Sequence, residues 1–147
     1  MSSFDAWKYR ADRDATILAY ARTERGGADT CNCAGCRNFR LVRAEVFPAE
    51  FLALLDKLGI DPGKDAEVYH NARLAPGRHD YGGWYHFVGT LAQNGEVPPV
   101  ELGGKFTVWM SHDAGAPRLS SLKGMQVVQV NFGSGAVPWR LDEPEME

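Results

Sequence analysis

Residues 66–92 read AEVYHNARLAPGRHDYGGWYHFVGTLA, and this stretch decides the fold that the rest of the chain can adopt. Apolar and polar residues alternate along 66–75, and aromatic residues are concentrated in 81–92, as is typical of β-strands. The intervening PGRHD, residues 76–80, has the composition of a turn. The stretch therefore predicts an antiparallel hairpin with a five-residue connection.

The hairpin also predicts a register. A connection centred near Arg78 places His70 opposite His86 on the neighbouring strand. Trp84 and Val88 lie two residues on either side of His86 and therefore share its face of the sheet. We expect the helices of the chain to cover this face.

The flanking segments extend the pattern in both directions. KFTVWMS (105–111) and MQVVQVNF (125–132) alternate like strands. CRNFRLVRAEV (36–46) and AEFLALLDKLG (49–59) place apolar residues at helical spacing. ATILAYAR (15–22) is short, apolar and partly β-branched, so both a strand and a helical turn fit it, and we favour a strand.

Together these segments predict an α+β fold, in which two helices from the N-terminal half pack on an antiparallel meander of about four strands. We expect a single domain over residues 1–141, because a chain of 147 residues is long enough to bury one continuous core. Residues 142–147 read DEPEME, with four acids around a proline, and predict an acidic flexible tail.

The composition excludes several classes of protein. A hydrophobic fraction of 44% and a charged fraction of 24% are typical of a globular chain. The net charge of −3 gives no attraction to nucleic acid or anionic lipid, and no apolar run is long enough to cross a bilayer, so neither partner is expected. The N-terminal MSSFDAWKYRADRDAT lacks the apolar core of a secretion signal, which predicts a cytoplasmic location where thiols stay reduced.

All the cysteines of the chain lie in TCNCAGCRNFRL, residues 30–41. Cys33 and Cys36 form a C-x-x-C pair, and two such thiolates can hold one tetrahedral zinc ion. A structural zinc site needs four ligands, and a second C-x-x-C is absent. We therefore predict a zinc site in which Cys31 is the third ligand and His86, shielded by neighbouring aromatic rings, is the fourth.

Two other interpretations of the thiols stay open. Reduced cysteines are often buried as inert small hydrophobic residues. A helix that begins at Cys36 would instead place this thiol in the positive field of a helix N-terminus and lower its pKa, with Cys33 as its redox partner. A cysteine hydrolase would further need an orienting histidine and acid, for which His86, His112 and Asp113 are available.

Other residues suggest weaker hypotheses. A basic stripe at helical spacing is expected to be a solvated helix face, and a group of polar side chains on the aromatic strand suggests a ligand groove. The stripe consists of Arg37, Arg40 and Arg43, and the groove residues are Tyr81, Tyr85 and His86. No P-loop, dinucleotide glycine fingerprint, HExxH or GxSxG motif occurs, which excludes the commonest classes that use them.

Three strings together resemble a family of small bacterial proteins that has no assigned function. They are CAGCRNF (33–39), FPAEFLALLDKLGIDP (47–62) and GGWYHFVG (82–89), and they match a C-x-x-C-x-N-[FY] segment, a helix ending in LGIDP and a GWYHF strand. Because that family has no known activity, the resemblance implies no catalytic residues. It does imply that Cys33, Cys36 and Asn38 act as a unit, and we expect Asn38 to tie the cysteine loop by hydrogen bonds.

The sequence thus favours a non-catalytic cytoplasmic module that binds a protein or a small molecule, with zinc at the cysteine cluster as the hypothesis for its site. The alternative is a thiol-dependent enzyme, either a redox protein or a hydrolase, that uses Cys36 or Cys33 with a histidine. A third class, an immunity or antitoxin-type inhibitor, is compatible with the size and acidity of the chain.

Overall fold

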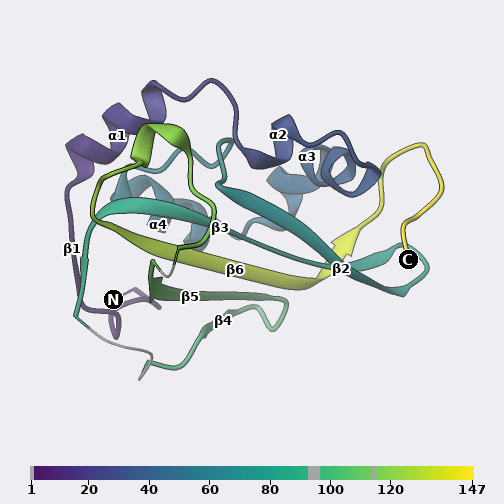
Figure 1. Ribbon diagram of the computed structural model, residues 1–147. Helices are drawn as coiled ribbons and strands as arrows, with labels where there is room; N and C mark the ends of the chain where they lie inside the picture. Colours follow the sequence, from purple (N-terminus) through teal and green to yellow (C-terminus); the bar gives the residue numbers. More distant parts are fainter. Residues whose placement is uncertain (1, 93–96, 114) are drawn as a thin grey trace.

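The computed structural model describes residues 2–92, 97–113 and 115–147. Its helices lie along one face of a curled antiparallel sheet (Figure 1). In chain order the elements are β1 (Tyr9–Ala11), α1 (Arg13–Ala21), α2 (Gly27–Thr30), α3 (Ala34–Val46), α4 (Ala49–Leu58), β2 (Glu67–Ala75), β3 (Arg78–Leu91), β4 (Val100–Leu102), β5 (Phe106–His112), the 3-10 helix η1 (Ser120–Leu122) and β6 (Val127–Pro138). The predicted α+β class is confirmed.

The sheet differs from the predicted meander in strand number and order. The described residues form a six-stranded sheet in the order β1-β3-β6-β5-β4, and β2 pairs with β3 beside this path. The last strand, β6, therefore lies between β3 and β5 instead of at the end of the sheet. β3 is long enough to pair with two strands on the edge opposite β6. Its first half pairs with β2, and its last residues pair with β1.

The predicted hairpin exists, but its connection is two residues long. Pairing continues to Ala75 and Arg78, which leaves Pro76 and Gly77 as the turn. Gly77 has a φ of +74°, a conformation that favours glycine, and proline suits the position before it. The predicted five-residue connection is therefore wrong, and the register shifts with it.

Both predicted central helices are confirmed. α3 begins two residues before the predicted Cys36, and α4 ends at Gly59, whose φ of +85° gives a left-handed cap. The preference for a strand at residues 15–22 was wrong, since Arg13–Ala21 form helix α1. Asp12 provides the signal that decides this, because its side chain accepts a hydrogen bond from Ala15 N at 3.1 Å and caps the helix.

A cluster of aromatic rings joins the two layers. Phe132 on β6 lies 6.0 Å from Phe39 of α3 and 5.8 Å from Phe51 of α4, measured between ring centroids. Phe106 of β5 lies 4.9 Å from Phe51, and these rings are at most 2% exposed. Their burial stabilises the packing of α3 and α4 on the sheet.

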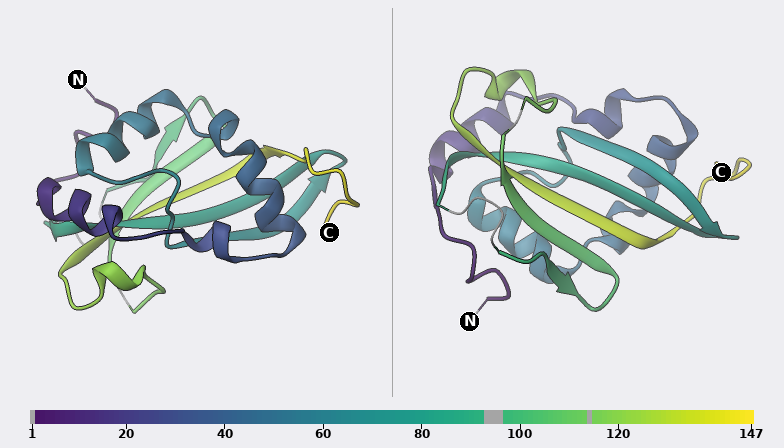
Figure 2. Two further views of the ribbon diagram at one scale, coloured as in Figure 1. Left: turned by 90° about the horizontal axis from the view of Figure 1, so that it is seen from above. Right: turned by 60° about the horizontal axis from the view of Figure 1, so that its bottom comes forward.

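The ends of the chain lie at opposite ends of the molecule. Seen from above, the first residues lie beyond α4 and the last residues lie beside α3, near the β2–β3 turn (Figure 2). The second view agrees with this placement (Figure 2). The cysteine loop, between α2 and α3, is therefore on the same side of the molecule as the C-terminal segment.

Candidate metal centre

The structure brings the three thiols together. The Sγ atoms of Cys31, Cys33 and Cys36 all lie within 4.8 Å of one another. Cys33 is exposed, Cys31 is half-buried and Cys36 is buried, so the group opens to solvent on one side. Across the described residues, no histidine or carboxylate belongs to this group. The site therefore offers a metal ion three sulfur ligands and leaves a fourth position for water or a partner.

The start of α3 orients two of these thiols. Cys33 is the N-cap residue, and its Sγ accepts a hydrogen bond from Cys36 N at 3.4 Å. The Sγ atoms of Cys31 and Cys33 are 3.2 Å apart. The helix begins at Ala34, two residues before Cys36, because Cys33 caps the backbone amide of Cys36.

The three positions differ in acidity. Burial raises the pKa of Cys33, but hydrogen bonds from Cys36 N and from the Cys31 thiol outweigh this effect and leave the pKa below its ordinary value. Burial is also the main reason why the pKa of Cys36 is raised, and its neighbouring thiols add to the shift. Cys33 is thus the thiol that ionises most readily of these two, opposite to the order predicted from the sequence.

Polar contacts hold the loop before α3 in place. Arg40 Nη1 donates to Ala28 O at 2.7 Å and to Cys31 O at 3.1 Å. Asp65, which is fully buried, accepts from Ala28 N at 3.1 Å and lies 3.5 Å from Arg43. The basic stripe is therefore not a solvated face as predicted, since Arg40 fixes the backbone of Cys31 and Arg43 pairs with the buried Asp65.

Asn38 and Tyr81 join the first turns of α3 to the sheet. Tyr81 Oη donates to Gly35 O at 2.8 Å, and Asn38 Nδ2 donates to Tyr81 Oη at 3.3 Å. Asn38 also donates to Pro138 O at 3.0 Å and accepts from Arg140 N at 2.7 Å. Asn38 thus reaches the cysteine turn through Tyr81 and holds the chain after β6, a longer connection than the local one we predicted.

His86 lies on the other face of the sheet from the helices. The predicted pairing of His70 with His86 is wrong, because His70 pairs with Tyr81, and His86 pairs with Gln129 on β6. Tyr85, one residue away, packs on Phe51 of α4, so alternation directs His86 away from the helices. His86 Nε2 donates to Gln129 Oε1 at 3.1 Å, and burial lowers its pKa. The proposed fourth ligand is therefore not beside the thiols.

The remaining predicted site residues serve other contacts. Tyr81 and Tyr85 are buried, and Tyr85 Oη donates to Pro62 O at 2.6 Å, so neither opens into a groove. Asp113 forms an ion pair with Arg118 of the following loop. His112, at the end of β5, is exposed.

Two hydrogen-bonded histidines, His70 and His79, lie on the hairpin beside the turn that carries Gly35. His70 Nε2 and His79 Nδ1 are hydrogen bonded at 2.8 Å, and His79 Nε2 donates to Glu145 Oε1 at 2.8 Å. The His70 ring lies 5.0 Å from the Tyr81 ring, which contacts Gly35 through its hydroxyl. Only the short turn at Pro76 could have indicated this register.

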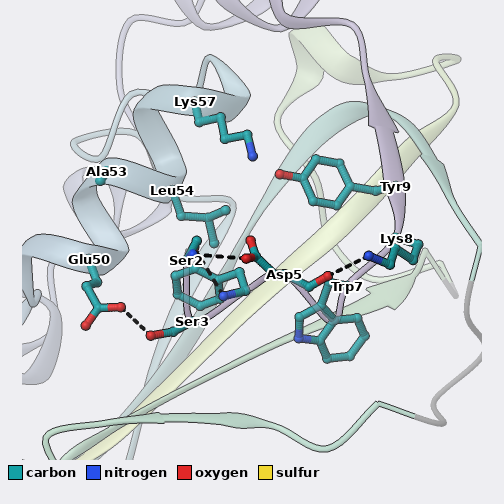
Figure 3. A pocket seen from close by; sticks show the side chains of 11 residues that line it. Ser2, Ser3, Asp5, Trp7, Lys8, Tyr9, Glu50, Ala53, Leu54 and Lys57 are labelled. Atoms are coloured by element: carbon teal, nitrogen blue, oxygen red, sulfur yellow. Dashed lines mark hydrogen bonds between the residues drawn. The ribbon is translucent and has the colours of Figure 1, made fainter.

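A hollow lies elsewhere on the molecule. A pocket of about 820 Å³ lies between the N-terminal segment and α4, with Leu54, Tyr9 and Lys57 around it (Figure 3). Several of its polar groups pair with one another: Ser3 bonds to Glu50, and Ser2 N donates to Asp5 at 3.1 Å (Figure 3). The hollow therefore shares no residue with the cysteine cluster.

Comparison with known proteins adds no identification. No protein-family model matches the chain, and no curated protein and no solved structure shows a significant similarity to it. The resemblance described above therefore stays a prediction. Among the residues that the structure describes, no helix has the length and apolarity needed to cross a membrane.

Proposed function

We propose that this chain is a non-catalytic cytoplasmic module that binds a protein or a small molecule, and that one zinc ion held by Cys31, Cys33 and Cys36 stabilises it. The observation that carries the proposal is the convergence of three Sγ atoms within 4.8 Å. Thiolates at tetrahedral positions are the ligands that zinc prefers in structural sites. The metal would fasten the loop between α2 and α3 and present an open fourth position.

The surroundings of the cluster support a prepared site. Arg40 fixes the backbone of Cys31, and the first turn of α3 fixes Cys33 relative to Cys36. Residues that hold ligands in place raise metal affinity, because less order has to be created when the ion binds. A protein or small molecule with one metal-binding atom can occupy the fourth position, which agrees with a binding role. Neither nucleic acid nor membrane is proposed as a partner.

Zinc titration against a chromophoric chelator tests the proposal. The unmodified chain should take up one zinc per molecule, and Cys31→Ser, Cys33→Ser and Cys36→Ser should each weaken binding by at least about tenfold. His86→Ala should bind zinc as the unmodified chain does, because His86 lies on the other face of the sheet. A chain that takes up no zinc, or that loses it on substitution of His86, contradicts the proposal.

A second candidate, a dithiol redox protein, is favoured by the difference between Cys33 and Cys36. The exposed Cys33 caps a helix, whereas Cys36 is buried behind it. In this reaction the Cys33 thiolate attacks a disulfide substrate, forms a mixed disulfide and releases one thiolate. Cys36, on losing its proton to solvent, then attacks the Cys33 sulfur, which forms the Cys33–Cys36 disulfide and releases the second thiol.

Reaction with oxidised glutathione separates the two candidates. A redox protein should form the Cys33–Cys36 disulfide with release of two glutathione thiols, and Cys36→Ser should stop at the mixed disulfide on Cys33. A metal module should be protected from this oxidation by one equivalent of zinc. Rapid oxidation that zinc does not slow would favour the redox candidate.

A further inference from the structure

The last nine residues, 139–147, form a segment that we call the strap. Asn38 anchors the first residues of the strap after β6. Its Oδ1 accepts hydrogen bonds from Arg140 N at 2.7 Å and from Leu141 N at 3.2 Å. Asn38 is fully buried, so this anchor is part of the core. The strap then runs beside α3 toward the β2–β3 turn (Figure 1).

The middle of the strap is held on α3 by charge. Glu143 forms a two-pronged ion pair with Arg37, which is the residue after Cys36. The hydrogen bonds from Arg37 are the main reason why the pKa of Glu143 lies below its ordinary value. Glu143 O also accepts from Trp139 Nε1 at 3.0 Å, which closes a compact loop within the strap.

The end of the strap is held on the hairpin. Glu145 accepts from His79 Nε2 at 2.8 Å, from Arg73 Nη2 at 2.9 Å and from Gly77 N at 2.8 Å. His79 is fully buried, lies under the Trp139 ring at 4.9 Å and connects to His70. The acidic segment that the sequence predicts to be a flexible tail therefore has a specific partner for Glu143 and for Glu145.

Met146 lies in a notch made by a glycine of the cysteine motif. Its Sδ is 2.8 Å from the position that a Cβ on Gly35 would take, so any other residue at position 35 would displace it. Glycine within a helix is unfavourable by about 1 kcal/mol relative to alanine, so this position needs a reason. The notch for Met146, directly before Cys36, provides that reason.

We propose that the strap is a releasable cover that controls access to Cys36, the buried thiol of the candidate metal centre. This inference rests on the proposed function only in that Cys36 is a proposed zinc ligand. The cover itself can be tested on metal-free protein. The strap is suited to release because its ion pairs are partly exposed: the side chain of Glu143 is 39% exposed and that of Glu145 is 21% exposed. Such pairs hold weakly compared with a packed apolar core.

Alkylation rates of the metal-free protein test the cover. Glu145→Gln and a chain that ends at Leu141 should each increase the alkylation rate of Cys36 by roughly fivefold or more, because a charge-assisted contact is lost. Asp142→Asn is the matched control, since it removes one acidic charge from the same segment at an exposed position. The rate at Cys33, which is already exposed, should change little in every variant.

Gly35→Ala provides a second, independent variant. Alanine favours the helix but occupies the notch, so the fold should be at least as stable while Cys36 becomes more reactive. Equal Cys36 rates in Glu145→Gln, Asp142→Asn and the unmodified chain would overturn the proposal. If Cys36 alkylates faster in the strap variants but the unmodified chain binds no zinc, the cover is supported and the metal function is refuted. The failure of one proposal is therefore distinguishable from the failure of the other.

Discussion

The aromatic core and the thiol end of α3 are each stabilised by a different kind of interaction. In the core, Phe39, Phe51 and Phe132 are in ring contact and fully or almost fully buried. At the thiol end, the contacts are hydrogen bonds and ion pairs from Arg37, Arg40 and other polar groups, and much of the surface is open. The aromatic core thus depends on apolar burial, whereas the thiol end depends on polar contacts between segments that are distant in the sequence.

The largest expected effect lies in the core. Phe51→Ala should lower the free energy of unfolding by about 3–5 kcal/mol, because it opens a cavity among packed rings. Denaturant unfolding with and without zinc measures this loss. An equal loss of unfolding free energy with and without zinc would show that the core is stabilised independently of the thiol end. A loss that zinc abolishes would show that the two regions are not independent.

The cysteine variants should have an effect that depends on zinc. With zinc at a hundredfold excess over its dissociation constant, the unmodified chain should gain about 2.7 kcal/mol, and Cys33→Ser and Cys36→Ser should lose comparable parts of this gain. Thermal unfolding at matched zinc concentrations measures the difference. Unequal zinc-dependent losses would argue against shared ligation by these two thiols.

Asn38→Ala tests the connection between the two regions. It removes the hydrogen bonds of Asn38 to the buried Tyr81 hydroxyl and to Arg140 N, so we expect a loss of roughly 2 kcal/mol whether or not zinc is present. Asn32→Ala, at an exposed position of the cysteine loop, is the matched control and should change stability little. A loss of similar size in both variants would show that the anchor is not specific to Asn38.

The smallest effect concerns pH. The hydrogen bond from His79 is the main reason why the folded pKa of Glu145 lies below its ordinary value of 4.5, with Gly77 N and Arg73 adding to it. Its contribution is therefore present above pH 4.5 and is lost as the pH falls through the lower folded value. Trp139 fluorescence should report release of the strap in this acidic range, and Glu145→Gln should reduce that step, leaving the part due to Glu143. A release midpoint above pH 4.5 would contradict this assignment.

The amino-acid sequence predicts the parts of the fold that depend on local patterns. Phe51, Leu54, Leu55 and Leu58 lie on one stripe, and Gly59 ends it, so α4 can be recognised without tertiary information. The proximity of the thiols also follows from their spacing. These features arise within a few turns of the chain.

The misplaced features depend on contacts between distant segments. The register of β2 and β3 rests on a two-residue turn at Pro76 and on two irregularities in the pairing, so the expected partner of His70 was His86 instead of Tyr81. Arg40 and Glu145 looked like solvated charges, because their partners Cys31 O and His79 are close only in the folded chain. A count of charges cannot distinguish a solvated acid from one that binds a buried imidazole.

The most direct test of the central claim is to count the thiols that zinc protects. Reduced protein with one equivalent of zinc is treated with an alkylating reagent, and mass spectrometry identifies the modified cysteines. Three thiols within 4.8 Å predict protection of Cys31, Cys33 and Cys36 together, and full modification after a chelator is added. Modification of all three in the presence of zinc, or protection of Cys36 alone, would contradict a shared metal site.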